Sequence, residues 1–251
     1  SEGRDRVTIT SRSERTSGDP YVMYVRGNAR DLGFLASILD QPWDIVIDFM
    51  KWGTTEFAKA CHLMLRSARR YVFLSSYRVY ADALPLTEAS PRLLDVTDDQ
   101  GYLATDEYAL AKARCEDILF ESGSRNWTIV RPAITYDACG RLQLGPMESE
   151  TWLWRAKDGL RVPFPREMID RQTTMTWAGD VARLICGLAR ADMAEGQAYN
   201  TSTSEHCSWG QVLACYQEVL PFEVLECELA EFEECWPNPY QIKYERMYDR
   251  V

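Results

Sequence analysis

Short apolar runs alternate with amphipathic stretches along the first half of the chain. Three runs are nearly continuous in apolar residues: "WDIVIDFM" (43–50), "RYVFLSS" (70–76) and "WTIVRPAI" (127–134). Such runs are typical of strands in a parallel sheet that is buried on both faces. Residues 55–68 and 106–123 have helical spacing, and Gly123 closes the second helix. The pattern predicts an α/β fold with a Rossmann-like, doubly wound parallel sheet.

The second half is less regular. After residue 139 we expect loops and a helix rather than another regular unit, then a helix over 176–191 and a strand over 197–203. Ser208 is the expected N-cap of a helix that ends at residue 220. Residues 223–234 read most simply as an exposed acidic helix face. We therefore predict a Rossmann-like domain over 1–139 and a small substrate-binding lobe over 140–251, of which residues 176–203 return to the sheet.

Composition excludes several classes of protein. The 38 acidic residues outnumber the 28 basic ones, and a net charge of −10 argues against nucleic-acid binding. No apolar run approaches the roughly 18 to 20 residues that span a membrane. The eight cysteines form no CxxC pair and there are two histidines, so no zinc or other metal site is expected. Scattered cysteines of this kind suit reduced, mostly buried thiols in the cytoplasm.

Tyr108 and Lys112 are the first candidates for chemistry. Four residues is about one helical turn, so the two side chains share a face of the predicted helix 106–123. A nearby cation lowers the pKa of a tyrosine and lets it exchange a proton with a substrate hydroxyl. The same spacing also occurs on ordinary solvated helices. Ser76 and the pair Arg131-Pro132 come at the carboxyl ends of neighbouring strands, where open α/β sheets bind ligands, and they favour the chemical interpretation.

These residues and motifs resemble the extended short-chain dehydrogenase/reductase family, especially its NAD-dependent epimerase/dehydratase branch, from about residue 6 to 220. The resemblance implies a catalytic triad of Ser76, Tyr108 and Lys112. Ser76 is chosen over Ser75 because it lies four residues before Tyr80 in the "VY" pair. In this family the tyrosine is the general acid/base, and the serine orients the substrate hydroxyl. The lysine lowers the tyrosine pKa and binds the nicotinamide ribose.

The resemblance also implies an NAD or NADP cofactor. Arg12, after the second strand of the family's sheet, weakly favours NADP because arginine accommodates a 2′-phosphate. No GxGxxG or GxxGxxG motif occurs, so the family's first strand, glycine loop and first helix are missing from these residues. Either the chain is part of a longer protein, or the protein lacks the loop. The expected cofactor contacts are Arg12, Asn28, Phe49, Met50, Lys51, Lys112, Pro132, Ala133 and Ile134.

The implied substrate is a nucleotide sugar or a related carbinol. Dehydratases of the family carry an acidic pair where this chain has Tyr77 and Arg78, which leaves an epimerase or a reductase. Tyr77, Arg78, Arg155 and Arg171 are the expected substrate contacts. The resemblance further implies a homodimer through the helices 55–68 and 106–123. The alternative is a catalytically silent Rossmann-like binding protein that has lost its cofactor.

Overall fold

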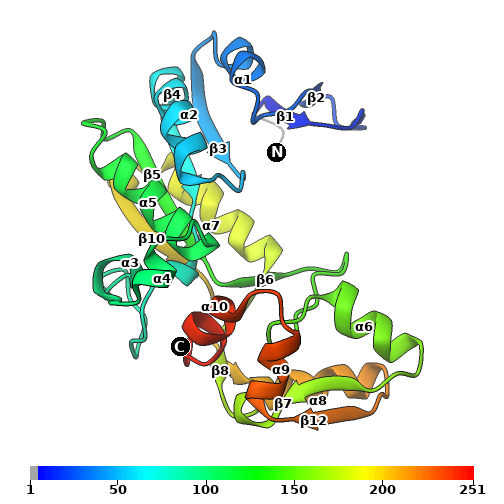
Figure 1. The fold of residues 1–251 in the computed structure, drawn as a ribbon. Helices are drawn as coiled ribbons and strands as arrows, with labels where there is room; N and C mark the ends of the chain where they lie inside the picture. Colours follow the sequence, from blue (N-terminus) through cyan, green and yellow to red (C-terminus); the bar gives the residue numbers. More distant parts are fainter. Residues whose placement is uncertain (1–4) are drawn as a thin grey trace.

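The computed structural model describes residues 5–251, and a four-stranded parallel sheet forms its framework (Figure 1). The strand order is β10-β5-β4-β3, and every neighbouring pair runs parallel. These strands are β3 (Trp43–Asp48), β4 (Ala68–Leu74), β5 (Trp127–Pro132) and β10 (Gln197–Thr201). The α/β class with a parallel central sheet is therefore confirmed.

Helices cover both faces of this sheet. Tyr71, Phe73 and Ile129 point to one face, where they pack with α2 (Thr54–Ser67) and α5 (Tyr108–Phe120). The alternate residues Val72 and Val130 point to the other face and pack with α7 (Ala178–Arg190). Successive side chains of a strand point to opposite faces, so the continuous apolar runs are required by this two-sided burial.

A second, smaller sheet lies apart from the first (Figure 1). It consists of β1 (Val7–Ser11) parallel to β2 (Val22–Arg26), and α1 (Leu32–Ile38) leads from it to β3. Among residues 5–251, no strand pairs with the second edge of β3. The apolar Ile45, Val46 and Ile47 of that strand are only half-buried. The two explanations for the missing strand, loop and helix, a longer protein or a protein without the loop, both stay predictions.

The lower lobe in Figure 1 packs around a core that also includes Tyr77, Val79, Tyr80 and Ala113 of the upper part. Its strands β7 (Val162–Pro165) and β12 (Val224–Cys227) pair in parallel. Around them lie α6 (Ser149–Lys157), α8 (Trp209–Val219) and α9 (Leu229–Cys235). Trp152 is buried and stacks on Tyr216 with ring centres 4.5 Å apart, so it is a packing residue, whereas Trp154 is exposed.

Short elements complete the chain. The parallel pair β6 (Ile134–Tyr136) and β9 (Met175–Trp177) and the antiparallel pair β8 (Gln172–Thr173) and β11 (Cys207–Ser208) join the two parts. The short helices are η1 (Tyr77–Val79), α3 (Leu93–Val96), α4 (Gln100–Leu103), η2 (Arg166–Met168), η3 (Asp192–Ala194), α10 (Pro239–Gln241) and η4 (Ile242–Arg246).

The structure confirms one detail of the sequence analysis and corrects another. Ser208 caps α8: its Oγ accepts from the Gln211 amide at 3.1 Å, and the Gln211 side chain accepts from the Ser208 amide at 2.8 Å. The prediction of one exposed helix face over 223–234 is wrong. Residues 224–227 form β12, and Phe232 of α9 is buried in the lobe core. Tertiary pairing with β7 overrides the local helical pattern.

The cysteines are also less buried than expected. All eight are free, but only Cys61 and Cys115 are buried. Cys139, Cys186, Cys215 and Cys235 are exposed, because they lie in a loop or on the outer faces of helices. Across the described part of the chain, no helix combines the length and the apolar character needed to cross a bilayer. A cytoplasmic location stays a prediction.

Candidate active site

The candidate residues meet where parallel strands end beside the start of α5. Residues 49–51 follow β3 and residues 75–76 follow β4, and α5 begins with Tyr108. The polar run Thr105-Asp106-Glu107 starts this helix: the Glu107 carboxylate accepts from the Ala109 amide at 2.8 Å. Asp106 accepts from the Thr54 amide at 3.0 Å and from its hydroxyl at 2.6 Å. The starts of α2 and α5 are thereby tied together.

Three cations surround the ring of Tyr108. The guanidinium carbon of Arg78 lies 5.0 Å from the ring centre, and the ammonium groups of Lys51 and Lys112 lie at 5.4 and 5.9 Å. Cations at such distances interact favourably with the ring face. The structure thus brings together residues that the sequence analysis assigned to different roles. Tyr108 and Lys112 were assigned to catalysis, Lys51 and Lys112 to the cofactor, and Arg78 to the substrate.

Lys112 is buried and held at a fixed place. Its Nζ donates to the carbonyl oxygen of Leu74 at 2.5 Å and to that of Met50 at 3.1 Å. It also lies 4.6 Å from the ring centre of Phe73. Burial lowers the pKa of Lys112, and the Asp48 carboxylate acts against that effect. The lysine thus bridges the ends of β3 and β4.

Asp48 is a site-supporting residue that the sequence analysis missed. Its carboxylate is buried and accepts from the Met50 amide at 2.8 Å, the Trp52 indole at 2.7 Å and the Tyr71 hydroxyl at 2.8 Å. Burial raises the pKa of Asp48, although these donors and Lys112 favour its charged form. An acidic residue at the end of an otherwise apolar strand was the available signal.

Ser76 lies beside Tyr108. Its Oγ accepts from the Arg78 amide at 3.2 Å and caps η1. Burial raises the pKa of Tyr108, while the nearby Ser76 side chain and the charge of Arg78 act in the opposite direction. Arg78 is thus the main cation that lowers this pKa. The hydroxyl of the neighbouring Ser75 is buried and has no hydrogen-bond partner among the described residues.

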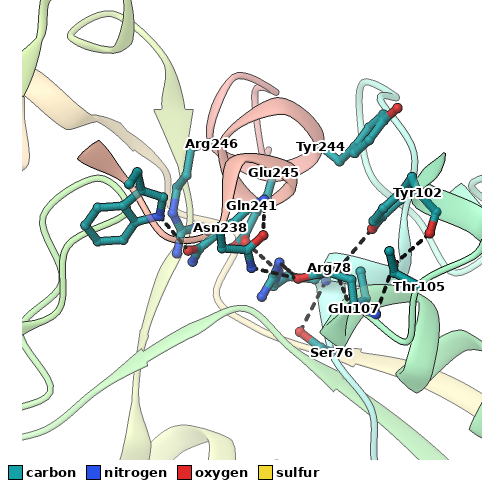
Figure 2. Close-up of polar contacts among 12 residues, drawn as sticks. Ser76, Arg78, Tyr102, Thr105, Glu107, Asn238, Gln241, Tyr244, Glu245 and Arg246 are labelled. Carbon is teal, nitrogen blue, oxygen red and sulfur yellow. Dashed lines mark hydrogen bonds and ion pairs between the residues drawn. The ribbon is translucent and has the colours of Figure 1, made fainter. Parts of the chain in front are cut away.

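Arg78 is held between two carboxylates, as Figure 2 shows. Its Nη2 donates to Glu107 at 2.7 Å, and its Nε forms an ion pair with Glu245 at 2.5 Å that lacks the alignment of a hydrogen bond. The hydroxyl of the buried Tyr77 donates to Glu245 at 2.5 Å and accepts from Arg246 at 2.9 Å. The polar groups of Tyr77 and Arg78 are therefore already engaged with the C-terminal segment.

At the end of β5, the side chain of Arg131 is paired inside the protein. The buried Arg131 donates to both oxygens of the buried Glu116, at 2.9 and 2.7 Å, and to the Tyr80 hydroxyl at 2.8 Å. Its charge is thus neutralised inside the protein. Pro132 ends β5, and Ala133 and Ile134 lead into β6, at the same edge as Ser76. Their contact with a cofactor stays a prediction.

The remaining residues that we expected to contact the cofactor or the substrate lie outside the group around Tyr108. Arg12 and Asn28 are exposed and follow β1 and β2, and the Asn28 side chain accepts from the Arg30 amide at 3.2 Å. Phe49, after β3, is 68% exposed. In the lobe, Arg155 donates to the Arg161 carbonyl at 3.0 Å, and Arg171 lies 3.8 Å from Asp249. Their roles in binding stay predictions.

Comparison with known proteins relates the chain to others through its fold. No family model matches the sequence, and no curated protein matches it significantly. A dTDP-glucose 4,6-dehydratase from Streptomyces venezuelae, with NAD and TYD bound, has a TM-score of 0.69 at 17% identity; the match covers 89% of this chain and 75% of that one. A UDP-glucose 4-epimerase from Thermotoga maritima, with UDP-glucose, has a TM-score of 0.66 at 12% identity, with coverage of 90% and 78%.

A third solved structure widens the comparison. It is a short-chain dehydrogenase/reductase superfamily protein from Agrobacterium tumefaciens with bound NAD. Its TM-score is 0.65 at 18% identity, and the match covers 88% of this chain and 77% of that one. This chain therefore has the fold of the short-chain dehydrogenase/reductase superfamily. The sugar epimerase and the sugar dehydratase described above have the same fold.

Proposed function

We propose that this protein is an NAD(P)-dependent oxidoreductase or epimerase that acts on a nucleotide sugar or a related carbinol. One observation carries the proposal: Tyr108 stands at the carboxyl edge of a parallel sheet, with Ser76 beside it and three cations around its ring. Ligands of open α/β sheets bind at this edge. The nucleotide-sugar part of the proposal comes from the solved structures with this fold.

Tyr108 would be the general acid/base, and Ser76 would orient the reacting oxygen. The raised pKa of Tyr108 keeps its hydroxyl protonated in the resting protein. In that form it can donate a proton to a carbonyl oxygen, and as phenolate it can remove one from a hydroxyl. Arg78 and Lys112 favour the phenolate by their charge. Lys112 also connects the ends of β3 and β4 through its two hydrogen bonds to carbonyl oxygens.

A nicotinamide dinucleotide, when bound, would accept and return the hydride. Its ribose end fits the chain. Lys112 has three N–H donors and spends two on carbonyl oxygens, which leaves one for a ribose hydroxyl. The buried, unpartnered Ser75 hydroxyl lies at the same strand end. The diphosphate end has no such support, because the 251 residues contain no glycine-rich loop. NAD is bound in the solved structures of the Streptomyces venezuelae dehydratase and of the Agrobacterium tumefaciens protein, whereas Arg12 favours NADP.

An epimerase or a reductase is favoured over a 4,6-dehydratase. Elimination of water needs a further acid/base next to the reacting carbon. Tyr77 and Arg78 follow Ser76, and both are engaged by Glu245. The Tyr77 hydroxyl donates to Glu245 and accepts from Arg246, so its proton and its oxygen are already engaged inside the protein.

The proposal also covers the substrate-binding lobe and the association of two protomers. Residues 140–251, with the arginines Arg155 and Arg171, would bind the substrate, apart from the segment 176–203. A homodimer would form through α2 and α5, which pack side by side on one face of the sheet. A solution mass of one protomer by light scattering would contradict the dimer.

The competing function is a silent Rossmann-like binding protein, and the absence of the glycine-rich loop favours it. Calorimetric titration with NAD(H) and NADP(H) separates the two. We expect binding of at least one dinucleotide, and weaker binding by Lys112→Met. The matched control Lys59→Met, on the exposed face of α2, should bind as the unaltered protein does. Absence of binding to all four dinucleotides would exclude the redox mechanism.

A further inference from the structure

The C-terminal segment, residues 238–251, is an integral part of the candidate site. It folds over the start of α5, as Figure 2 shows for Asn238, Glu245 and Arg246. Five of its side chains are buried: Ile242, Tyr244, Glu245, Arg246 and Arg250. Its end is held by backbone hydrogen bonds, from Leu86 to the Val251 carbonyl at 2.8 Å and from Arg250 to the Gln172 carbonyl at 3.0 Å.

This segment reaches both carboxylates that hold Arg78. Glu245 belongs to the segment and forms the 2.5 Å ion pair with Arg78. Asn238 donates to Glu107, the second carboxylate, at 3.2 Å. Glu107 also accepts from the Tyr102 hydroxyl at 3.2 Å. The place of the Arg78 guanidinium is thus determined by contacts on two sides, one of them made by the C-terminal segment.

The cluster around Arg78 is rich in buried charge. The buried or nearly buried arginines Arg78, Arg246 and Arg250 lie with the carboxylates Glu107 and Glu245, and the charge of Asp82 also acts on Arg250. Arg78 is the member next to Tyr108. Charges in such surroundings are little screened by solvent, so their effect on a neighbouring phenol is large.

We infer that Arg78 is a positioning residue for Tyr108 whose charge favours the phenolate, and that the Glu245 carboxylate of the C-terminal segment, paired with this guanidinium, opposes that effect by its own charge. The inference rests on the proposed function, in which Tyr108 is the acid/base. It assigns to the C-terminal segment a direct influence on the proton affinity of the reacting group.

The groups that face Tyr108 come from four parts of the fold. They are Lys51 after β3, Ser76 and Arg78 before and within η1, Glu107 and Lys112 on α5, and Glu245 of η4. Arg78 lowers the pKa of Tyr108, whereas Glu245 and Glu107 raise it by their negative charge. Loss of Arg78 and loss of Glu245 must therefore move this pKa in opposite directions.

The test is a pH titration of the protein labelled with ¹³Cζ-tyrosine, followed by NMR without cofactor or substrate. The Tyr108→Phe protein identifies the Tyr108 resonance. We expect Arg78→Met to move its midpoint to higher pH and Glu245→Gln to move it to lower pH. Arg78→Lys, which keeps the charge, should return the midpoint toward that of the unaltered protein. Lys243→Met is the matched control, because this exposed cation of the same segment pairs with Asp99 and should leave the midpoint unchanged.

Shifts of Arg78→Met and Glu245→Gln in the same direction, or no shift in Arg78→Met, would overturn the inference. If Glu245→Gln fails to fold, Glu107→Gln removes the other carboxylate and must also lower the midpoint. Because the titration needs no ligand, it is independent of dinucleotide binding. A protein that binds no dinucleotide but shows opposite shifts would refute the proposed function alone.

Discussion

The guanidinium carbon of Arg78 lies 5.0 Å from the ring centre of Tyr108, closer than the ammonium of Lys112 at 5.9 Å. The lysine one helical turn along is instead bonded to the carbonyl oxygens of Leu74 and Met50. The two cations therefore have different roles. Arg78 acts mainly on the proton affinity of Tyr108, and Lys112 acts mainly on the shape of the sheet edge.

Lys112→Met should destabilise the protein as well as weaken dinucleotide binding. It leaves two carbonyl oxygens without their donor and removes the cation that favours the charged form of the buried Asp48. An unsatisfied buried polar group costs about 1–3 kcal/mol. Urea unfolding measures the loss, and Lys59→Met should change the unfolding free energy by less than about 0.5 kcal/mol. Equal stability of the two variants would contradict the structural role of Lys112.

Asp48 should make the protein less stable as the pH rises. Its pKa is raised in the folded state, so the folded protein binds this proton more tightly than the unfolded chain does. Its contribution to the unfolding free energy is therefore greatest below the ordinary value of 3.8 and falls as the pH rises through the folded-state value. The difference in unfolding free energy between the unaltered protein and Asp48→Asn should fall over this range. A difference that rises with pH would contradict the assignment.

Glu245 should behave in the opposite way. Burial opposes its charge, but Arg246 and Arg78 outweigh that effect and lower its pKa. Its contribution to stability is fully present above the ordinary value of 4.5 and is lost as the pH falls through the folded-state value. Relative to Glu245→Gln, the unaltered protein should lose stability in acid, as chemical unfolding at several pH values would measure. A constant difference across that range would count against the ion pairs.

Removing only one partner of the ion pair between Arg131 and Glu116 should strongly reduce the unfolding free energy. Glu116→Gln leaves the buried Arg131 without its charged partner, which we expect to cost about 3–5 kcal/mol. The double variant Arg131→Met with Glu116→Leu should recover much of that loss, because apolar residues can replace a buried ion pair. Denaturant unfolding of the single variants Arg131→Met and Glu116→Leu and of the double variant tests this. Additive losses would show that the pair is not coupled.

The sequence predicts the sheet and the meeting of Ser76, Tyr108 and Lys112 for one physical reason. Continuous apolar runs mark strands buried on both faces, and the carboxyl ends of parallel strands lie at one edge. Asp48 was visible as an acidic residue at such an end, but its three donors come from elements whose packing the pattern does not specify.

The contacts that hold Arg78 and Tyr77 against the C-terminal segment could not be predicted from the sequence. Tyr77 and Glu245, which are in contact, lie 168 positions apart, and residues 238–246 have no strong periodicity. Their short helices form against the rest of the protein, since Glu245 and Arg246 are buried there as a paired group. The same dependence on tertiary contacts explains why β12 appeared in a segment that read as a helix.

The most direct test of the central claim is turnover of nucleotide sugars by the Tyr108→Phe protein. With a panel of UDP- and dTDP-sugars, net oxidation or reduction of the nicotinamide at 340 nm measures a reductase, and conversion of one sugar into its epimer, followed by NMR, measures an epimerase. One of the two should be measurable for the unaltered protein. Loss of a general acid/base typically costs about 10²–10⁴ in rate, so we expect kcat to fall by that factor while the dinucleotide Kd stays unchanged. Full turnover by Tyr108→Phe would contradict the account.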